Sequence, residues 1–252
     1  MRLSVISPVL NEEFFIPIYL KAVLKYADEV VLLDGGSQDK TVEIIEEFQR
    51  KTDKIKLFIK PQNGKPYSEE WNEGQRRNFL VNKCTGDWIL ALDVDEFMSD
   101  NFVKFLPQLM KDGDMNFYSF KYIPFWKRVN LIRLSTPQDP HWAGEIARMG
   151  RRDGFSYSQS KHHCVPLYNG KPIWRVEKHK RVLSIVLYHY HYALGPRIKE
   201  NDNRRGDVDL ADKKGNPDWD YEPDDYSIKT APFNGKHPEV IRDYLKQNRR
   251  IR

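Results

Sequence analysis

Hydrophobic residues in the first hundred positions follow two spacings in turn. Short apolar runs typical of strands occur at 3–7, 30–33, 55–59 and 88–92. Between them, residues 14–26 and 41–48 place apolar side chains at helical spacing, and 71–82 is also expected to be helical. Pro8 is expected to end the first strand. The alternation predicts a mostly parallel α/β sheet.

The pattern changes in the second part of the chain. A helix is expected over 99–110, followed by strands over 116–125 and 182–192. Residues 199–226 are polar and rich in Asp, Lys, Asn, Gly and Pro, which predicts a long loop or a mobile segment. A short helix over 238–247 then leads to a basic end.

Polar and acidic residues follow three of the predicted strands directly, at 8–13, 34–41 and 93–96. In parallel α/β sheets, ligands bind beyond the carboxyl ends of the strands. The sequence therefore predicts a single site at this edge of the sheet.

Two of these segments carry recognisable chemistry. Asp93 and Asp95 can converge on one hard cation such as Mg²⁺ or Mn²⁺, although a solvated acidic turn or a helix N-cap is the simpler alternative. In the segment 34–41, two glycines allow a ligand to approach the backbone, and Asp34 can accept hydrogen bonds from a ribose or a base. Part of that segment is explained without a ligand, by Asp39 capping the next helix.

Taken together, the segments resemble glycosyltransferase family 2, and more closely its lipopolysaccharide-core-like subgroup. The motifs that carry the resemblance are Ser7-Pro8-Val9-Leu10-Asn11-Glu12, Asp34-Gly35-Gly36-Ser37-Gln38-Asp39-Lys40-Thr41, Arg77-Asn78, Gly86-Asp87-Trp88-Ile89-Leu90 and Asp93-Val94-Asp95-Glu96. The resemblance implies the GT-A fold, a Rossmann-like sheet flanked by helices with a mixed acceptor-binding C-terminal half. It also implies metal-dependent, inverting transfer of a sugar from a nucleoside-diphosphate sugar to an acceptor hydroxyl.

The resemblance also assigns residues. Those expected to contact the nucleotide are Pro8, Asn11, Glu12, Asp34, Gly36, Arg77 and Asp93. Those expected to hold Mn²⁺ or Mg²⁺ are Asp93, Asp95, His189 and His191, although two hydrogen-bonded histidines on a half-buried strand would explain the last pair without a metal. Basic side chains that could assist the diphosphate are Arg77, Arg148, Arg151 and Arg152.

Two further points concern catalysis and specificity. The general base is expected to be Glu145 or its rival His163, with a simple surface acid as the alternative role for Glu145. The family often carries a second acidic residue directly after the position of Asp34, where this chain has Gly35. The identity of the donor base therefore stays open between uracil, guanine and thymine.

Composition narrows the class of protein. The 252 residues carry 41 Lys and Arg against 36 Asp and Glu, a net charge of +5, which permits anionic partners without choosing among them. The 2 cysteines are too few for a disulfide framework or a four-cysteine zinc site. No apolar run approaches the roughly 20 residues of a membrane span, and the first residues do not match a signal peptide. A cytoplasmic protein without stable membrane insertion is expected.

We expect residues 1–110 to bind the nucleotide sugar, 111–198 to form the acceptor-binding half of the same domain, and 199–252 to form a polar loop and C-terminal helix. The segment 199–226 is a candidate lid. Acceptors compatible with the sequence are a glycan, a lipopolysaccharide core, a lipid-linked sugar or a hydroxymethylated DNA base. Two other classes stay open, a nucleotidyltransferase and a noncatalytic nucleic-acid or polysaccharide binder. The oligomeric state is not predicted.

Overall fold

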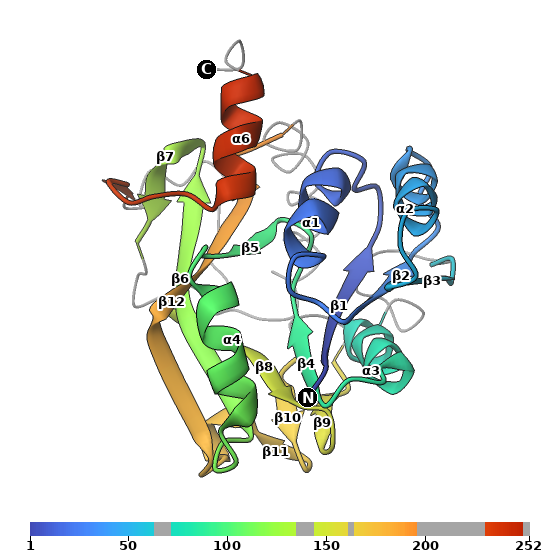
Figure 1. Ribbon diagram of the computed structural model, residues 1–252, viewed down its shortest axis with the longest axis vertical. Coiled ribbons are helices and arrows are strands. Elements are labelled where there is room, and N and C mark those ends of the chain that lie inside the picture. Colours follow the sequence, from blue (N-terminus) through green and yellow to red (C-terminus); the bar gives the residue numbers. More distant parts are fainter. Residues whose placement is uncertain (63–71, 135–143, 161–163, 196–229, 249–252) are drawn as a thin grey trace, which may run out of the picture.

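The computed structural model describes residues 1–62, 72–134, 144–160, 164–195 and 230–248 (Figure 1). Its first half is a parallel sheet in the order β3-β2-β1-β4. The strands are β1 (Leu3–Val9), β2 (Glu29–Asp34), β3 (Ile55–Ile59) and β4 (Trp88–Ala91). The connecting helices are α1 (Ile16–Val23), α2 (Thr41–Gln49) and α3 (Glu73–Lys83). The predicted strand–helix alternation is confirmed here.

Both faces of this parallel sheet are covered, as its continuous apolar runs indicate. In β2, Val30 and Leu32 belong to one hydrophobic cluster, whereas Val31 and Leu33 belong to a second cluster. All four side chains are fully buried. The sheet therefore positions its carboxyl ends rigidly.

Proline 8 lies inside β1, so the expectation that it ends the strand is wrong. Val9 accepts a bond from the amide of Gly35 beyond β2, and Ile6 accepts one from Leu92 beyond β4. The backbone N–H and C=O groups of successive residues in a strand point to opposite sides. The nitrogen of Pro8 therefore points towards β4, like the carbonyl of Ile6. The pairing of β1 with β4 ends at Ile6, before Pro8. The missing N–H of the proline therefore removes no bond of the sheet.

The second half is mixed and continues the same sheet, which has ten strands in all among the described residues. Its elements are β5 (Glu96–Met98), α4 (Phe102–Lys111), β6 (Phe117–Trp126), β7 (Arg128–Arg133), β8 (Glu145–Arg151), β12 (His179–Tyr192) and β13 (Thr230–Pro232). Strand β8 joins the halves because it pairs antiparallel with both β4 and β6. Strand β12 runs parallel to β6 and antiparallel to the short β5.

Smaller elements complete the fold. A second sheet consists of β9 (Phe155–Tyr157), β10 (Pro166–Tyr168) and β11 (Lys171–Pro172), followed by the 3-10 helix η3 (Ile173–Arg175). The last helix, α6 (Glu239–Gln247), packs against α1. There Tyr244 makes an edge contact with Phe14 at 5.5 Å. The predicted loop and lid over 199–226 lies outside the described residues, and none of the described helices is long and apolar enough to cross a membrane.

Candidate active site

The loops that follow β1 and β2 are joined to each other by side-chain hydrogen bonds. The Asn11 amide donates to Ser37 Oγ at 2.8 Å, and the Gln38 amide donates to Asn11 Oδ1 at 2.8 Å. Asn11 has φ of 54°, a left-handed conformation that asparagine tolerates better than most residues. The Glu12 amide donates to Thr41 Oγ1 at the start of α2, 2.6 Å away. The two loops predicted to line a nucleotide pocket therefore form one unit.

Asp34 holds this unit from inside. Its buried carboxylate accepts hydrogen bonds from the amide of Gly36 at 2.7 Å and from the amide and hydroxyl of Ser37 at 2.9 and 2.5 Å. Both oxygens are thus engaged within the loop. In this arrangement Asp34 fixes the backbone of the loop that follows β2.

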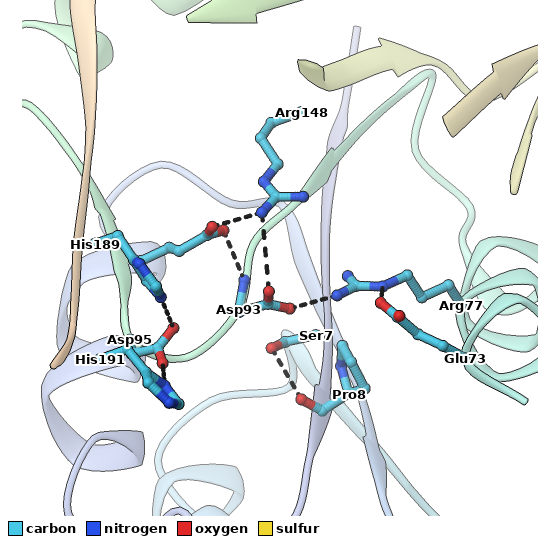
Figure 2. A network of polar contacts seen from close by, with 10 residues as sticks. Ser7, Pro8, Glu73, Arg77, Asp93, Asp95, Arg148, His189 and His191 are labelled. Atoms are coloured by element: carbon cyan, nitrogen blue, oxygen red, sulfur yellow. Dashed lines mark hydrogen bonds and ion pairs between the residues drawn. The ribbon is translucent and has the colours of Figure 1, made fainter. Parts of the chain in front are cut away.

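Two arginines hold Asp93, the first residue of the acidic loop after β4 (Figure 2). Arg77 on α3 donates from Nη2 to Asp93 Oδ1 at 2.8 Å, and Arg148 on β8 places Nη2 3.8 Å from Asp93 Oδ2. Burial alone would raise the pKa of Asp93, but the two guanidinium groups outweigh it and lower the pKa. Asp93 is therefore a carboxylate at neutral pH.

The same arginines are anchored by further carboxylates. Arg77 donates from Nε to Glu73 at 2.7 Å, one helical turn away on α3, and Arg148 donates from Nη2 to the buried Glu96 at 2.5 Å. The Asp93 amide donates to Glu96 Oε2 at 3.0 Å. Charge-assisted bonds of this kind fix orientation as well as charge, so the loop and both arginines form a rigid network.

Asp95 meets two histidines of β12. Asp95 Oδ2 lies 2.6 Å from His191 Nδ1, and Asp95 Oδ1 lies 3.5 Å from His189 Nε2. Burial alone would raise the pKa of Asp95, but the histidines hold it well below its usual range. The pairing of β5 with β12 sets Glu96 opposite His189, which brings these side chains together.

These three residues fit a divalent cation. One donor atom from each lies within 4.8 Å of the others. Asp95 Oδ1 is buried and accepts no hydrogen bond from the residues that the structure describes. A carboxylate and two imidazoles suit Mn²⁺ and its neighbours in the transition series, while Mg²⁺ prefers oxygen alone.

Two arginine nitrogens at the site also lack a hydrogen-bond partner among the described residues. They are Arg77 Nη1 and Arg148 Nε, both buried. Buried N–H groups are almost always paired in native proteins, so these two point to a missing acceptor. With Asp95 Oδ1 nearby, the site offers donors for an anion and an oxygen for a cation.

Other predicted residues lie elsewhere. Glu145 stands beside Lys121 in the β6–β8 ladder, and the next residue on β6, Tyr122, stacks on His189 at 5.7 Å. Successive side chains point to opposite faces, so Glu145 faces away from His189, and it pairs with Arg181 at 3.2 Å. The structure does not bring Glu145 together with the acidic loop. His163 lies outside the described residues.

Arg151 and Arg152 are also remote from the site. Arg151 donates to the carbonyls of Met115 and Asp112 at 2.9 and 3.0 Å, and Arg152 donates to that of Gly86 at 2.7 Å. These contacts are at the amino end of β4, opposite to the acidic loop. Their expected role at the diphosphate is therefore wrong, whereas Glu73 and Glu96 belong to the network and were missed. Glu73 could have been predicted, because it lies four residues before Arg77 on a predicted helix, a spacing that favours an ion pair.

Comparison with known proteins identifies relatives. The family model "Glycosyl transferase family 2" matches residues 4–166. An uncharacterized glycosyltransferase of Mycoplasma pneumoniae, the MG060 homolog, is 31% identical over 55% of this chain and 42% of its own length. The poly(ribitol-phosphate) β-N-acetylglucosaminyltransferase TarS of Staphylococcus aureus is 28% identical over 71% of this chain and 30% of its own. This chain thus spans less than half of these relatives.

Solved structures agree in fold. The S. aureus TarS crystal structure aligns with a TM-score of 0.53 and 14% identity, over 83% of this chain and 39% of that one. The mannosyltransferase PcManGT of Pyrobaculum calidifontis, solved with GDP-Man and Mn²⁺, aligns with a TM-score of 0.50 and 14% identity, over 97% and 68%. The predicted GT-A architecture is confirmed.

Proposed function

The chain belongs to glycosyl transferase family 2, and from this premise we propose that it transfers a sugar from a nucleoside-diphosphate sugar to an acceptor hydroxyl. The observation that carries the proposal is the set of buried polar atoms around the acidic loop that have no hydrogen-bond partner among the described residues. Arg77 Nη1 and Arg148 Nε offer hydrogen bonds to an anion, and Asp95 Oδ1 offers an oxygen to a cation. A diphosphate with a bound divalent cation satisfies both requirements at once.

Asp95, His189 and His191 would hold the divalent cation, for which their ligand set favours Mn²⁺ over Mg²⁺, with Asp93 between them and the arginines (Figure 2). When bound, the cation would act as a Lewis acid that neutralises the diphosphate leaving group. The mannosyltransferase PcManGT was solved with GDP-Man and Mn²⁺, which agrees with this assignment.

The arginines would act on the leaving group directly. Burial alone would lower the pKa of Arg77 and Arg148, but their carboxylate neighbours raise both, so the side chains stay charged. As the bond between the anomeric carbon and the phosphate oxygen breaks, negative charge grows on the diphosphate. Preorganised guanidinium groups stabilise that charge without reorganisation.

In an inverting displacement, the acceptor oxygen bonds to the anomeric carbon from the face opposite the leaving diphosphate and gives its proton to a general base. Since Glu145 faces the other side of the sheet, it is a poor candidate in this arrangement. His163 stays a prediction. We place the acceptor in the mixed half of the fold, where the Tyr192 ring lies 4.9 Å from the Trp126 ring and 4.6 Å from the His191 ring.

The proposal is tested by incubating the protein with UDP-, GDP- and TDP-sugars, with Mn²⁺ or EDTA, and following nucleoside diphosphate release by mass spectrometry. One donor is expected to be cleaved, slowly with water and faster with an oligosaccharide acceptor. Proton NMR of the product sugar distinguishes inversion from retention. If no donor is consumed while DNA or polysaccharide binds in EDTA, a noncatalytic binding module is the better description.

A further inference from the structure

Strand β8 carries one more residue than its partner β6 along their shared ladder. Met149 lies opposite Tyr118, and Ala147 lies opposite Ser119, the next residue of β6. Arg148, between them, has no opposite residue, which is the pattern of a β-bulge. Bulges bend a strand locally and redirect a side chain, and they are frequent next to active sites.

The bulge changes which side chains of β8 face the site. Tyr118 and Tyr122 lie on one face of β6 because they are four positions apart, and Tyr122 stacks on His189. Met149 shares that face, since it lies opposite Tyr118. In a regular strand the neighbouring Arg148 would point to the other face, but at the bulge it reaches the carboxylates beside His189. The extra residue therefore supplies the site with an arginine.

The same bulge turns Glu145 away from the site. In a strand without the extra residue, every second position counted from Met149 would share its face, and Glu145 is one of these positions. With the extra residue, Glu145 lies opposite Lys121 on the other face and pairs with Arg181. One position in β8 thus replaces an acid with a base at the site.

The position of the Arg148 side chain depends on Glu96 and not on Asp93. Arg148 Nη2 lies 2.5 Å from Glu96 Oε1 but 3.8 Å from Asp93 Oδ2, which is too long for a hydrogen bond. The other oxygen of Glu96 accepts the Asp93 amide at 3.0 Å. Glu96 is buried, so one carboxylate inside the protein holds both the backbone of the acidic loop and the arginine.

We propose that Glu96 is a positioning residue, which keeps Arg148 directed at the diphosphate while Asp93 contacts the ligands. This inference rests on the proposed function. Arg148 Nε is buried and has no hydrogen-bond partner among the described residues, so it is a donor that stays open while Glu96 engages Nη2. A guanidinium group that is already oriented loses less conformational freedom when it binds an anion.

The test is a double-mutant cycle, measured by isothermal titration of inorganic pyrophosphate in saturating Mn²⁺. Glu96→Gln keeps an oxygen for the Asp93 amide and removes the charge that holds Arg148. It is expected to lower the pyrophosphate affinity of the otherwise wild-type protein about tenfold. Arg148→Ala is expected to lower that affinity about tenfold or more. Adding Glu96→Gln to Arg148→Ala is expected to change it by less than about twofold, because the residue that Glu96 positions is already gone.

Two controls distinguish positioning from damage to the fold. Glu29→Gln removes another buried carboxylate, which bonds the Gly86 amide at the amino end of β4, and is expected to keep the wild-type pyrophosphate affinity. Mn²⁺ affinity, measured by electron paramagnetic resonance, is expected to fall less in Glu96→Gln than pyrophosphate affinity does, since the three proposed metal ligands remain. Should Glu96→Gln not fold, Glu96→Asp, which withdraws the carboxylate by one methylene, takes its place in the cycle with the same expected pattern.

The outcomes separate the two proposals. If Glu96→Gln weakens pyrophosphate binding equally with and without Arg148, or leaves it unchanged in both, the positioning role is overturned and the proposed function stands. If Mn²⁺ affinity falls as much as pyrophosphate affinity, Glu96 supports the acidic loop as a whole, and the positioning role is likewise overturned. If the wild type binds neither pyrophosphate nor any nucleotide, the proposed function fails, and this inference fails with it.

Discussion

Asp95 and His191 are separated by 96 positions in the chain, yet their carboxylate oxygen and ring nitrogen lie 2.6 Å apart. The contact depends on β5, a strand of three residues that pairs antiparallel with β12. It joins the acidic loop of the parallel half to the histidines of the mixed half. The proposed metal site is therefore built by the union of the two halves.

Replacing His191 tests whether this contact is a metal site or a plain hydrogen bond. We expect His191→Ala and His189→Ala each to weaken Mn²⁺ binding by at least about tenfold, because each removes one of three ligands. Electron paramagnetic resonance of free Mn²⁺ measures the affinity. His179→Ala, on the same strand but bonded to Ser119, is the matched control. Equal Mn²⁺ affinity in the wild type and all three variants would show that the histidines only form hydrogen bonds and do not bind the metal.

Replacing the arginines tests the anion side of the site. Arg77→Ala is expected to weaken pyrophosphate binding about tenfold or more, since hydrogen bonds to charged groups contribute about 1.5–3 kcal/mol. The pyrophosphate affinity of Arg77→Lys is expected to lie between those of the wild type and Arg77→Ala, because lysine keeps the positive charge but lacks the planar set of guanidinium donors. Calorimetry measures both, with Arg152→Ala at the far end of β4 as control. If Arg77→Ala binds pyrophosphate as tightly as the wild type, Arg77 does not bind the diphosphate.

His237 gives a prediction about pH. Burial, assisted by Arg242, lowers its pKa from 6.5 to about 4. Between these values the unfolded chain binds a proton that the folded protein does not, so the free energy of unfolding decreases as pH falls from 6.5 to 4. The loss is on the order of 1 kcal/mol after allowing for solvent screening.

Urea unfolding at several pH values measures this effect. In His237→Phe the pH dependence across this window is expected to flatten, because phenylalanine keeps the contact with Phe125 at 5.0 Å and does not titrate. A variant whose free energy of unfolding falls as steeply as that of the wild type would show that another group is responsible.

Glu29 lies at the amino ends of the strands, far from the acidic loop, so replacing it is expected to change the stability of the fold and not ligand binding. Burial would raise its pKa, but bonds from Lys56, Ser4 and Thr85 lower it from 4.5 to about 2. The carboxylate therefore stabilises the fold above pH 4.5, and this contribution is lost as the pH falls towards 2. Glu29→Gln is expected to lower the free energy of unfolding at pH 7 by about 1–3 kcal/mol.

This difference between the proteins should shrink between pH 4.5 and 2, which urea unfolding can follow. Nucleotide affinity of the folded variant is expected to match the wild type, since Glu29 binds the amino ends of the strands, including the Gly86 amide at 3.1 Å. A large loss of affinity in a well-folded variant would contradict this separation of stability from function.

The parallel half and its loops could be predicted because their signals are local. Each strand is a continuous apolar run, and each site segment follows a strand directly in the sequence. The error at Pro8 arose because the direction of one backbone position depends on the neighbouring strand. The mixed half was harder, since β5 has only 3 residues and the sequence of β8 shows no regular alternation of apolar and polar residues.

The site residues were likewise predictable only where a local pattern in the sequence marks them. Asp93 and Asp95 were identified from their place after β4, and Arg77 from a motif. Pairing of β8 with β4 decides that Arg148 reaches the site while Arg151 turns away, and no local pattern contains that information. The same holds for Glu145, whose face is set by its register with Lys121.

The central claim is that one site binds a divalent cation and a nucleoside diphosphate together. The most direct test is a thermal-shift panel of nucleoside diphosphates with Mn²⁺ or EDTA, on the wild type and on Asp95→Asn, with Asp243→Asn on the exposed face of α6 as control. Ligand binding raises apparent stability by mass action. We predict a nucleotide-induced shift that needs Mn²⁺, persists in Asp243→Asn and disappears in Asp95→Asn. Equal shifts with Mn²⁺ and EDTA, or a full shift in Asp95→Asn, would contradict the account.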